Sequence, residues 1–216
     1  MNSAQQAEAR LQMTNQQVRT WDVLDADVLA VQASIPRENF VAAHLQAIAY
    51  ADAPLPIGHQ QHLWSPKLAG KVLQTLAVKP GESILEIGTG SGYLSACLAG
   101  LGAKVTSIEI HPDLAAQAKR HWASCHITGI DLINADALSL DFDHAFDVVV
   151  FTASLEECPA IAWNWIKPNG RIALPLGREL QRLTRLTGYA DHPLVETLFE
   201  TAVDPLIQAP RKHFEF

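Results

Sequence analysis

The spacing of apolar residues changes at Pro66, and the part of the chain before it has a helical pattern. Apolar positions recur there every three to four residues, which is the period of an amphipathic helix. Thr14 and Gln17 form a capping-box pair before one predicted helix. Asp25 is placed to cap a second helix, which must end near the next proline. Residues 35–52 predict one more short helical stretch.

After Pro66, helical segments alternate strictly with short apolar runs rich in β-branched residues. The predicted helices cover residues 67–78, 91–102, 112–125 and 157–166, and the predicted strands cover residues 83–87, 104–110, 130–135, 146–153 and 171–176. Continuously apolar strands between helices predict a parallel sheet covered on both faces. Residues 181–188 and 194–203 have the alternating pattern of a hairpin, which would add antiparallel strands to one edge of the sheet.

Length and composition fit one soluble α/β domain. The chain has 216 residues, of which 48% are hydrophobic and 18% are charged. We expect residues 1–66 to form an N-terminal helical extension with a substrate-side loop, and residues 67–216 to form the core of the same structural domain. The formal net charge of -7 lacks the basic footprint of a nucleic-acid-binding protein, so we expect no nucleic-acid partner.

The sequence also bears on location and on metal binding. Its first residues lack the apolar region of a signal peptide, and no apolar run is long enough to span a membrane. Its three scattered cysteines fit a reducing compartment, so we expect a cytoplasmic protein that does not associate with membranes. The nine histidines show no ligand spacing, and we expect no metal site.

A glycine-rich loop follows the first predicted strand of the core and opens a helix. Gly88, Gly90 and Gly92 permit a tight turn and the close approach of a ligand, and Thr89 and Ser91 lie between them. The third glycine comes one position too early for the dinucleotide fingerprint G-x-G-x-x-G. No Lys-Ser/Thr pair follows the glycines, which argues against a nucleoside triphosphate.

Acidic residues stand at the ends of three successive predicted strands. These are Glu86, Glu109 and Asp136. Ligands of open α/β sheets bind at the carboxyl ends of the strands, so we expect the three carboxylates to converge there. Glu86 would receive an ammonium group directly or through water, Glu109 would accept the two hydroxyls of a ribose, and Asp136 would accept an adenine amino group.

A ligand with a ribose, a positive charge and no phosphate fits S-adenosylmethionine best. The predicted cofactor site therefore comprises the glycine-rich loop and the three acids, together with the following residues Ile110 and Ala137. Other roles stay open: Glu86 as a helix-dipole partner, Glu109 as a solvated strand end and Asp136 as a helix cap. A more distant alternative for the whole chain is an NAD-dependent oxidoreductase.

With these motifs, the chain resembles the protein-L-isoaspartate O-methyltransferase family from about Met13 to its C-terminus. The segments that carry the resemblance, in the family's order, are QQVRTWDVLD, IPRENFV, AYADAPLPIGH, VLQTLAVKPGESILEIGTGSGYLSACLA, FDVVVFTAS, IKPNGRIALPLG and VDPLI. The resemblance implies a Rossmann-like S-adenosylmethionine-dependent methyltransferase fold. Such a fold has a mostly parallel seven-stranded sheet, helices on both faces and, here, an N-terminal helical extension. It also implies methyl transfer to a carboxylate of damaged protein.

The segment PLPIGHQQHLWSP, residues 54–66, is where the chain departs from that family. The family pattern resembles Gly-His-Gly-Gln-Thr-Ile-Ser-x-Pro, in which the two hydroxyls line the place where the methyl group meets the acceptor carboxylate. In this chain Gln60 replaces the second glycine, His62 the threonine and Trp64 the serine. His62 and Trp64, with the family-matching His59, are the candidate catalytic residues.

These replacements leave the methyl acceptor open. A carboxylate is already an anion, whereas a hydroxyl or amine acceptor has a proton that a histidine base could remove. Three hypotheses remain: methyl transfer to isoaspartyl groups of a protein or peptide, transfer to another, small-molecule acceptor, and a cofactor-binding protein without transfer activity. The purely structural alternatives are that His59 braces the loop, His62 faces solvent and Trp64 plugs the pocket. The sequence does not predict an oligomeric state.

Overall fold

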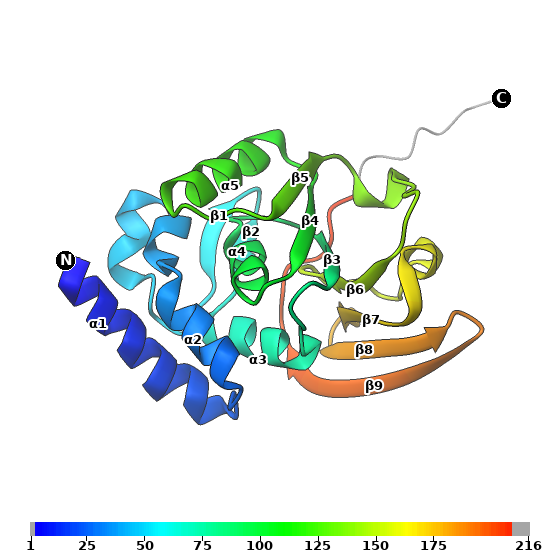
Figure 1. The fold of residues 1–216 in the computed structure, drawn as a ribbon, viewed down its shortest axis with the longest axis horizontal. Helices are drawn as coiled ribbons and strands as arrows, with labels where there is room; N and C mark the ends of the chain where they lie inside the picture. Colours follow the sequence, from blue (N-terminus) through cyan, green and yellow to red (C-terminus); the bar gives the residue numbers. More distant parts are fainter. Residues whose placement is uncertain (1–2, 209–216) are drawn as a thin grey trace.

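The computed structural model describes residues 3–208. Seven of its strands form one sheet in the order β5-β4-β3-β6-β7-β8-β9 (Figure 1). The strands are β3 (Ser83–Ile87), β4 (Lys104–Glu109), β5 (Ile130–Asn134), β6 (Phe146–Phe151), β7 (Ile166–Leu176), β8 (Gln181–Tyr189) and β9 (His192–Thr201). The first five strands of that order are parallel. The last two add antiparallel pairs at the β7 side. The predicted α/β fold with its edge hairpin is confirmed.

The central strand β6 explains the continuous apolar runs. Val148 and Val150 belong to one hydrophobic cluster, whereas Val149 and Phe151 belong to the other. Successive side chains of a strand point to opposite faces, so a strand covered on both faces is apolar throughout. The helices are α1 (Ser3–Met13), α2 (Ala26–Ser34), α3 (Pro66–Leu76), α4 (Tyr93–Gly100) and α5 (Pro112–Ser124). Helices α2 to α5 contribute to the first cluster, and short 3-10 helices over Ala137–Ser139 and Ala160–Asn164 contribute to the second.

The N-terminal helices share a core with the rest of the domain. The first hydrophobic cluster joins Val18 and Val28 to Val72 of α3 and Leu98 of α4. Figure 1 shows α1 and α2 beside α3, on one flank of the sheet. No helix within residues 3–208 combines the length and apolar character needed to cross a membrane.

Two predicted helix starts near the N-terminus have different outcomes. Asp25 caps α2 as predicted, since its Oδ1 accepts the backbone N–H groups of Asp27 and Val28 at 2.9 and 3.1 Å. The predicted cap at Thr14 is wrong, because the helical backbone runs through it into a π-helical turn over Thr14–Val18. The Thr14 hydroxyl donates instead to the carbonyl of Arg10, a bond that satisfies the side chain inside a helix.

Three other segments differ from the pattern-based prediction. Residues 35–52 form two 3-10 helices, Arg37–Phe40 and Ala43–Ile48, and the helix predicted over 157–166 shrinks to Ala160–Asn164. Prolines precede the first and the last of these, and a proline disfavours α-helical backbone in the residue before it. Strand β7 starts five residues earlier than predicted, because an irregularity in its pairing with β6 accommodates KPNG. The loop over 54–66 contains a hairpin of β1 (Leu55–Gly58) and β2 (Gln61–Leu63).

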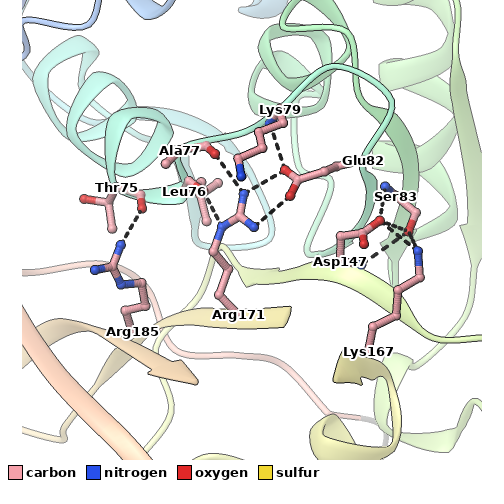
Figure 2. A network of polar contacts seen from close by, with 10 residues as sticks. All are labelled: Thr75, Leu76, Ala77, Lys79, Glu82, Ser83, Asp147, Lys167, Arg171 and Arg185. Carbon is pink, nitrogen blue, oxygen red and sulfur yellow. Dashed lines mark hydrogen bonds and ion pairs between the residues drawn. The ribbon is translucent and has the colours of Figure 1, made fainter. Parts of the chain in front are cut away.

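A polar network ties α3 to the amino ends of the parallel strands (Figure 2). Arg171 of β7 donates to the carbonyls of Leu76 and Ala77 at the end of α3 and makes two bonds to the Glu82 carboxylate at 3.0 and 2.8 Å. Next to it, the Asp147 carboxylate accepts from Lys167 and from Ser83. The opposite, carboxyl ends of the same strands stay available for a ligand site.

Candidate active site

A cavity lies at the carboxyl ends of the parallel strands, between the β1–β2 hairpin and the glycine-rich loop. Its lining comes from the hairpin, the loop after β3, the end of β4, the segments after β5 and β6, and the C-terminal segment around Asp204. Of the predicted site residues, the following line it: His62, Trp64, Gly88, Thr89, Gly90, Ser91, Glu109, Ile110, Asp136 and Ala137. His59, Glu86 and Gly92 are not part of the lining.

All three glycines of the glycine-rich loop have a positive φ, and at Gly88 and Gly92 an added Cβ would meet its nearest neighbours. Gly88 has φ +94°, and a Cβ there would lie 2.3 Å from Oγ1 of Thr152, which follows β6. Gly92 has φ +84°, and a Cβ there would lie 2.6 Å from Nε1 of Trp122 on α5. That indole N–H donates to the Gly92 carbonyl at 2.8 Å. Gly92 therefore shapes the loop through α5 rather than through the cavity.

Glu109, at the end of β4, is both buried and part of the cavity wall. It is 4% exposed, so the alternative of a solvated strand end is wrong. Its two oxygens accept the backbone N–H groups of Gly90 at 2.7 Å and His111 at 3.0 Å. Each carboxylate oxygen has a further lone pair, so Glu109 can hold the loop and still accept hydroxyl groups of a ligand.

Glu86 lies behind the loop instead of in the cavity. Its side chain points toward α4, where it accepts a hydrogen bond from Ser95, and it accepts a second one at 2.5 Å from Ser107 of β4. Burial raises its pKa to about 7, against the lowering effect of the two serine hydroxyls. Glu86 does not line the cavity, so a direct contact with a ligand's ammonium group is not available in this arrangement, and a contact through water stays a prediction. Ser107 also bonds to the hydroxyl of Thr89, which links Glu86 to the loop.

Asp136 is a helix cap, which is one of the roles considered from the sequence, and it also lies at the cavity. Its Oδ1 accepts the N–H of Leu138 at 3.0 Å and so caps the 3-10 helix over Ala137–Ser139. The residue also lines the cavity. It follows β5, which is at the edge of the sheet opposite β8 and β9. Its predicted contact with an adenine amino group stays a prediction.

The turn of the β1–β2 hairpin is held against α5 by His59. The ring of His59 stacks on that of His111 at 3.7 Å between centroids, and its Nε2 lies 2.9 Å from both carboxylate oxygens of Asp113. The His59 pair with Asp113 lowers the pKa of that aspartate. His59 thus braces the hairpin, as the structural alternative proposed, and it is not placed as a catalytic residue.

His62 and Trp64 of the same hairpin face the cavity. Trp64 is 9% exposed, and its carbonyl accepts from the buried guanidinium of Arg37 at 2.5 Å. The Nδ1 atom of His62 lies 3.1 Å from a carboxylate oxygen of Asp204, which also accepts the His62 backbone N–H at 2.8 Å. Sequence reasoning missed both Arg37 and Asp204. No local pattern marks either one, because each contact joins distant parts of the chain.

The charges of the cavity indicate which ligand suits it. Its lining carries the carboxylates of Glu109, Asp136 and Asp204, and among the described residues it includes neither lysine nor arginine. A pyrophosphate would be repelled there, whereas a positively charged ligand rich in hydroxyl and amino groups would be attracted. The side chains therefore fit S-adenosylmethionine better than a dinucleotide. No group of three or more histidine, cysteine or acidic side chains within residues 3–208 is arranged to hold a metal ion.

Known proteins resemble the chain over nearly all of the described residues. The family model "Protein-L-isoaspartate(D-aspartate) O-methyltransferase (PCMT)" matches residues 9–206. A protein-L-isoaspartate O-methyltransferase of Gloeobacter violaceus is 35% identical over 93% of this chain and 100% of its own length. One of Methanoculleus marisnigri is 37% identical over 82% of this chain and 81% of its own.

The fold also resembles a solved structure. A crystal structure of a Plasmodium falciparum protein, described as a candidate enzyme of the same kind in complex with S-adenosyl-L-homocysteine, superposes with a TM-score of 0.82. It is 21% identical in sequence and covers 93% of this chain and 99% of its own. At that identity the likeness concerns the fold.

Proposed function

The chain belongs to the protein-L-isoaspartate(D-aspartate) O-methyltransferase family and is an S-adenosylmethionine-dependent methyltransferase, and on this basis we propose that it methylates a carboxylate of isoaspartyl residues in damaged proteins or peptides. The observation that carries the proposal is the family match over residues 9–206, which includes the hairpin and all the residues that line the cavity except Ile207. The acceptor is accordingly a protein or a peptide.

We propose that the glycine-rich loop, Glu109 with Ile110, and Asp136 with Ala137 hold the cofactor. S-adenosylmethionine, when bound, supplies an electrophilic methyl group on a sulfonium centre. Glu109 would accept ribose hydroxyls while it fixes Gly90 from behind, and Asp136 would accept the adenine amino group. Because the loop is fixed by Glu109 and by Trp122, it needs little rearrangement to bind its ligand.

We propose that the hairpin covers the acceptor side of the cavity. Trp64 places a large apolar surface there and is held by Arg37, so it can exclude water from the reacting groups. An anionic carboxylate needs no general base, and the protein has only to align it and to keep it desolvated. His62 and Gln61 are polar side chains of the hairpin that line this space, and of the two only His62 can carry a positive charge.

Two further assignments belong to this proposal. Residues 1–66 would act as a helical extension with the substrate-side loop, and residues 67–216 as the methyltransferase core of the same domain. We also propose a cytoplasmic location, because the three cysteines are free and two of them are partly accessible.

Methyl transfer to a defined peptide tests the proposal. The full chain would be incubated with methyl-labelled S-adenosylmethionine and a peptide that contains one isoaspartyl residue, and the same peptide with normal aspartate is the control. We expect S-adenosylhomocysteine and a base-labile methyl ester from the isoaspartyl peptide alone. Cofactor binding without ester, under conditions where a known enzyme of this family gives product, would refute the assigned acceptor.

The cofactor site has its own test by calorimetry. Glu109→Gln directs an amide N–H at one of the two backbone N–H groups that the carboxylate now accepts. We expect affinity for S-adenosylhomocysteine to fall by about 5- to 150-fold, since an unsatisfied buried group costs roughly 1–3 kcal/mol. Asp131→Asn, an exposed change on β5, is the matched control and should bind normally. Equal affinity of both variants would contradict the role of Glu109.

A further inference from the structure

His62 and Asp204 form a side-chain pair at the acceptor side of the cavity, although they are 142 residues apart in sequence. Asp204 lies just beyond β9, and its carboxylate accepts the backbone N–H of His62 while its two oxygens lie 3.1 and 3.2 Å from Nδ1 of the ring. Both residues line the cavity. The two contacts together fix the ring more firmly than a single bond would.

The pairing decides which ring nitrogen is left for a ligand. A carboxylate only accepts hydrogen bonds, so Nδ1 carries the hydrogen that it donates to Asp204. Nε2 is then the ring nitrogen available to a ligand, and it can be either protonated or unprotonated. In the neutral ring Nε2 is an acceptor, and in the imidazolium it is a donor. An anionic acceptor group requires the donor state.

The surrounding charges bear on that choice. The titratable groups that share the cavity with His62 are Asp204 from the C-terminal segment, Glu109 and His111 around the end of β4, Asp136 after β5, and Tyr93 of α4, whose pKa is raised by burial. The ring of His111 is stacked on His59. Three carboxylates and no lysine or arginine among the described lining residues would repel a carboxylate acceptor. His62 is the lining group that can supply a compensating positive charge on the hairpin side.

We propose that the imidazolium of His62, oriented by Asp204, binds the acceptor carboxylate through Nε2–H and so does the work of a hydroxyl donor in this chain. His62 would touch the substrate, and Asp204 would be a positioning residue that acts through it. This inference rests on the proposed function, because it concerns the carboxylate of the isoaspartyl substrate. Methyl transfer would then depend on a protonated group, which a hydroxyl donor would not require.

The pH dependence of kcat/KM for the isoaspartyl peptide tests the inference. We expect kcat/KM to decline toward high pH, by about tenfold per pH unit beyond the midpoint, as the imidazolium loses its proton. His62→Thr supplies a donor that does not titrate, so activity should remain and the decline should disappear. Asp204→Asn keeps an oxygen for Nδ1–H but removes its charge, so the decline should begin at lower pH. His192→Gln, an exposed change on β9, is the control and should keep the wild-type profile.

Two results of these profiles would overturn the inference. One is a kcat/KM that rises with pH in a His62-dependent way, because His62 would then act as a base on an acceptor that carries a proton. The other is an unaltered decline in His62→Thr. Binding of S-adenosylhomocysteine by each variant confirms that it is folded.

An NMR titration separates this inference from the proposed function. The His62 ring would be titrated in the protein saturated with S-adenosylhomocysteine, with and without the isoaspartyl peptide. Binding of the carboxylate to the imidazolium should move the midpoint of the His62 titration to higher pH. An unmoved or lowered midpoint overturns the role of His62 even if methyl ester forms. A raised midpoint without ester formation supports His62 and refutes the proposed function.

Discussion

Asp147, in the polar network of Figure 2, should make a measurable and pH-dependent contribution to stability. Burial alone would raise its pKa, but hydrogen bonds from Lys167 and Ser83 outweigh that effect and lower the pKa from 3.8 to about 2. A difference of this size corresponds to roughly 2.5 kcal/mol. The side chain of Lys167 is 44% exposed, so solvent screens the pair and we expect roughly 1–2 kcal/mol instead.

The sign follows from the lowered pKa. The folded protein holds the proton of Asp147 less tightly than the unfolded chain does, so the contribution is fully present above about pH 4. It is lost as the pH falls toward 2, the pKa in the folded protein. Asp147→Asn should therefore lower the free energy of unfolding at pH 7, and the loss at pH 3 should be about half as large.

Urea unfolding at pH 7 and at pH 3 measures both values. Asp131→Asn, at an exposed position of β5, is the matched control for the loss of one negative charge. If Asp147→Asn and Asp131→Asn unfold at the same urea concentration at pH 7, the pair with Lys167 contributes nothing. If Asp147→Asn loses as much free energy of unfolding at pH 3 as at pH 7, packing rather than charge explains the loss, and the reasoning fails.

Three more predictions concern the loops and the buried acid. Gln60 has φ +57° at the turn of the hairpin, so Gln60→Gly should raise the Tm by about 2–8 °C in calorimetry, since a left-handed residue costs roughly 1–2 kcal/mol unless it is glycine. Gly92→Ala should weaken S-adenosylhomocysteine binding at least about tenfold, because its Cβ would meet Trp122. Gly81→Ala, with φ +87° and no neighbour within 4 Å, separates backbone strain from that clash and should bind normally. Glu86 has a pKa raised to about 7 by burial, which favours folding with the proton bound, so wild-type stability should decline from about pH 4.5 to 7. Glu86→Gln should remove that decline in urea unfolding, and an identical decline in both proteins would contradict it.

Local spacing was sufficient for the elements of the core and for several of their ends. The apolar run of β6, the cap at Asp25 and the glycine-rich loop after β3 all lie where the pattern predicts them. Each depends on residues within a few positions of one another, which is the range over which hydrophobic period and capping act. The number of strands followed from the family resemblance rather than from spacing, and their order came from the structure.

The direction in which the Glu86 side chain points could have been predicted from the sequence. Period-two alternation in β3 places Glu86 on the same face as Ile84, under α4, whereas Leu85 and Ile87 face the other cluster. Glu86 was predicted to contact the ligand only because it lies at the end of a strand. The alternation of the strand would have placed this acid away from it.

The partners of the acceptor-side hairpin were decided by tertiary structure alone. His62 meets Asp204 only after the chain has completed the whole sheet and returned past β9, and Arg37 reaches the Trp64 carbonyl from a separate 3-10 helix. The sequence by itself determined a glycine-rich methyltransferase core and identified the segment 54–66 as divergent. It did not determine what the new side chains would contact, because a local pattern encodes the conformation of a segment and not the distant groups that pack against it.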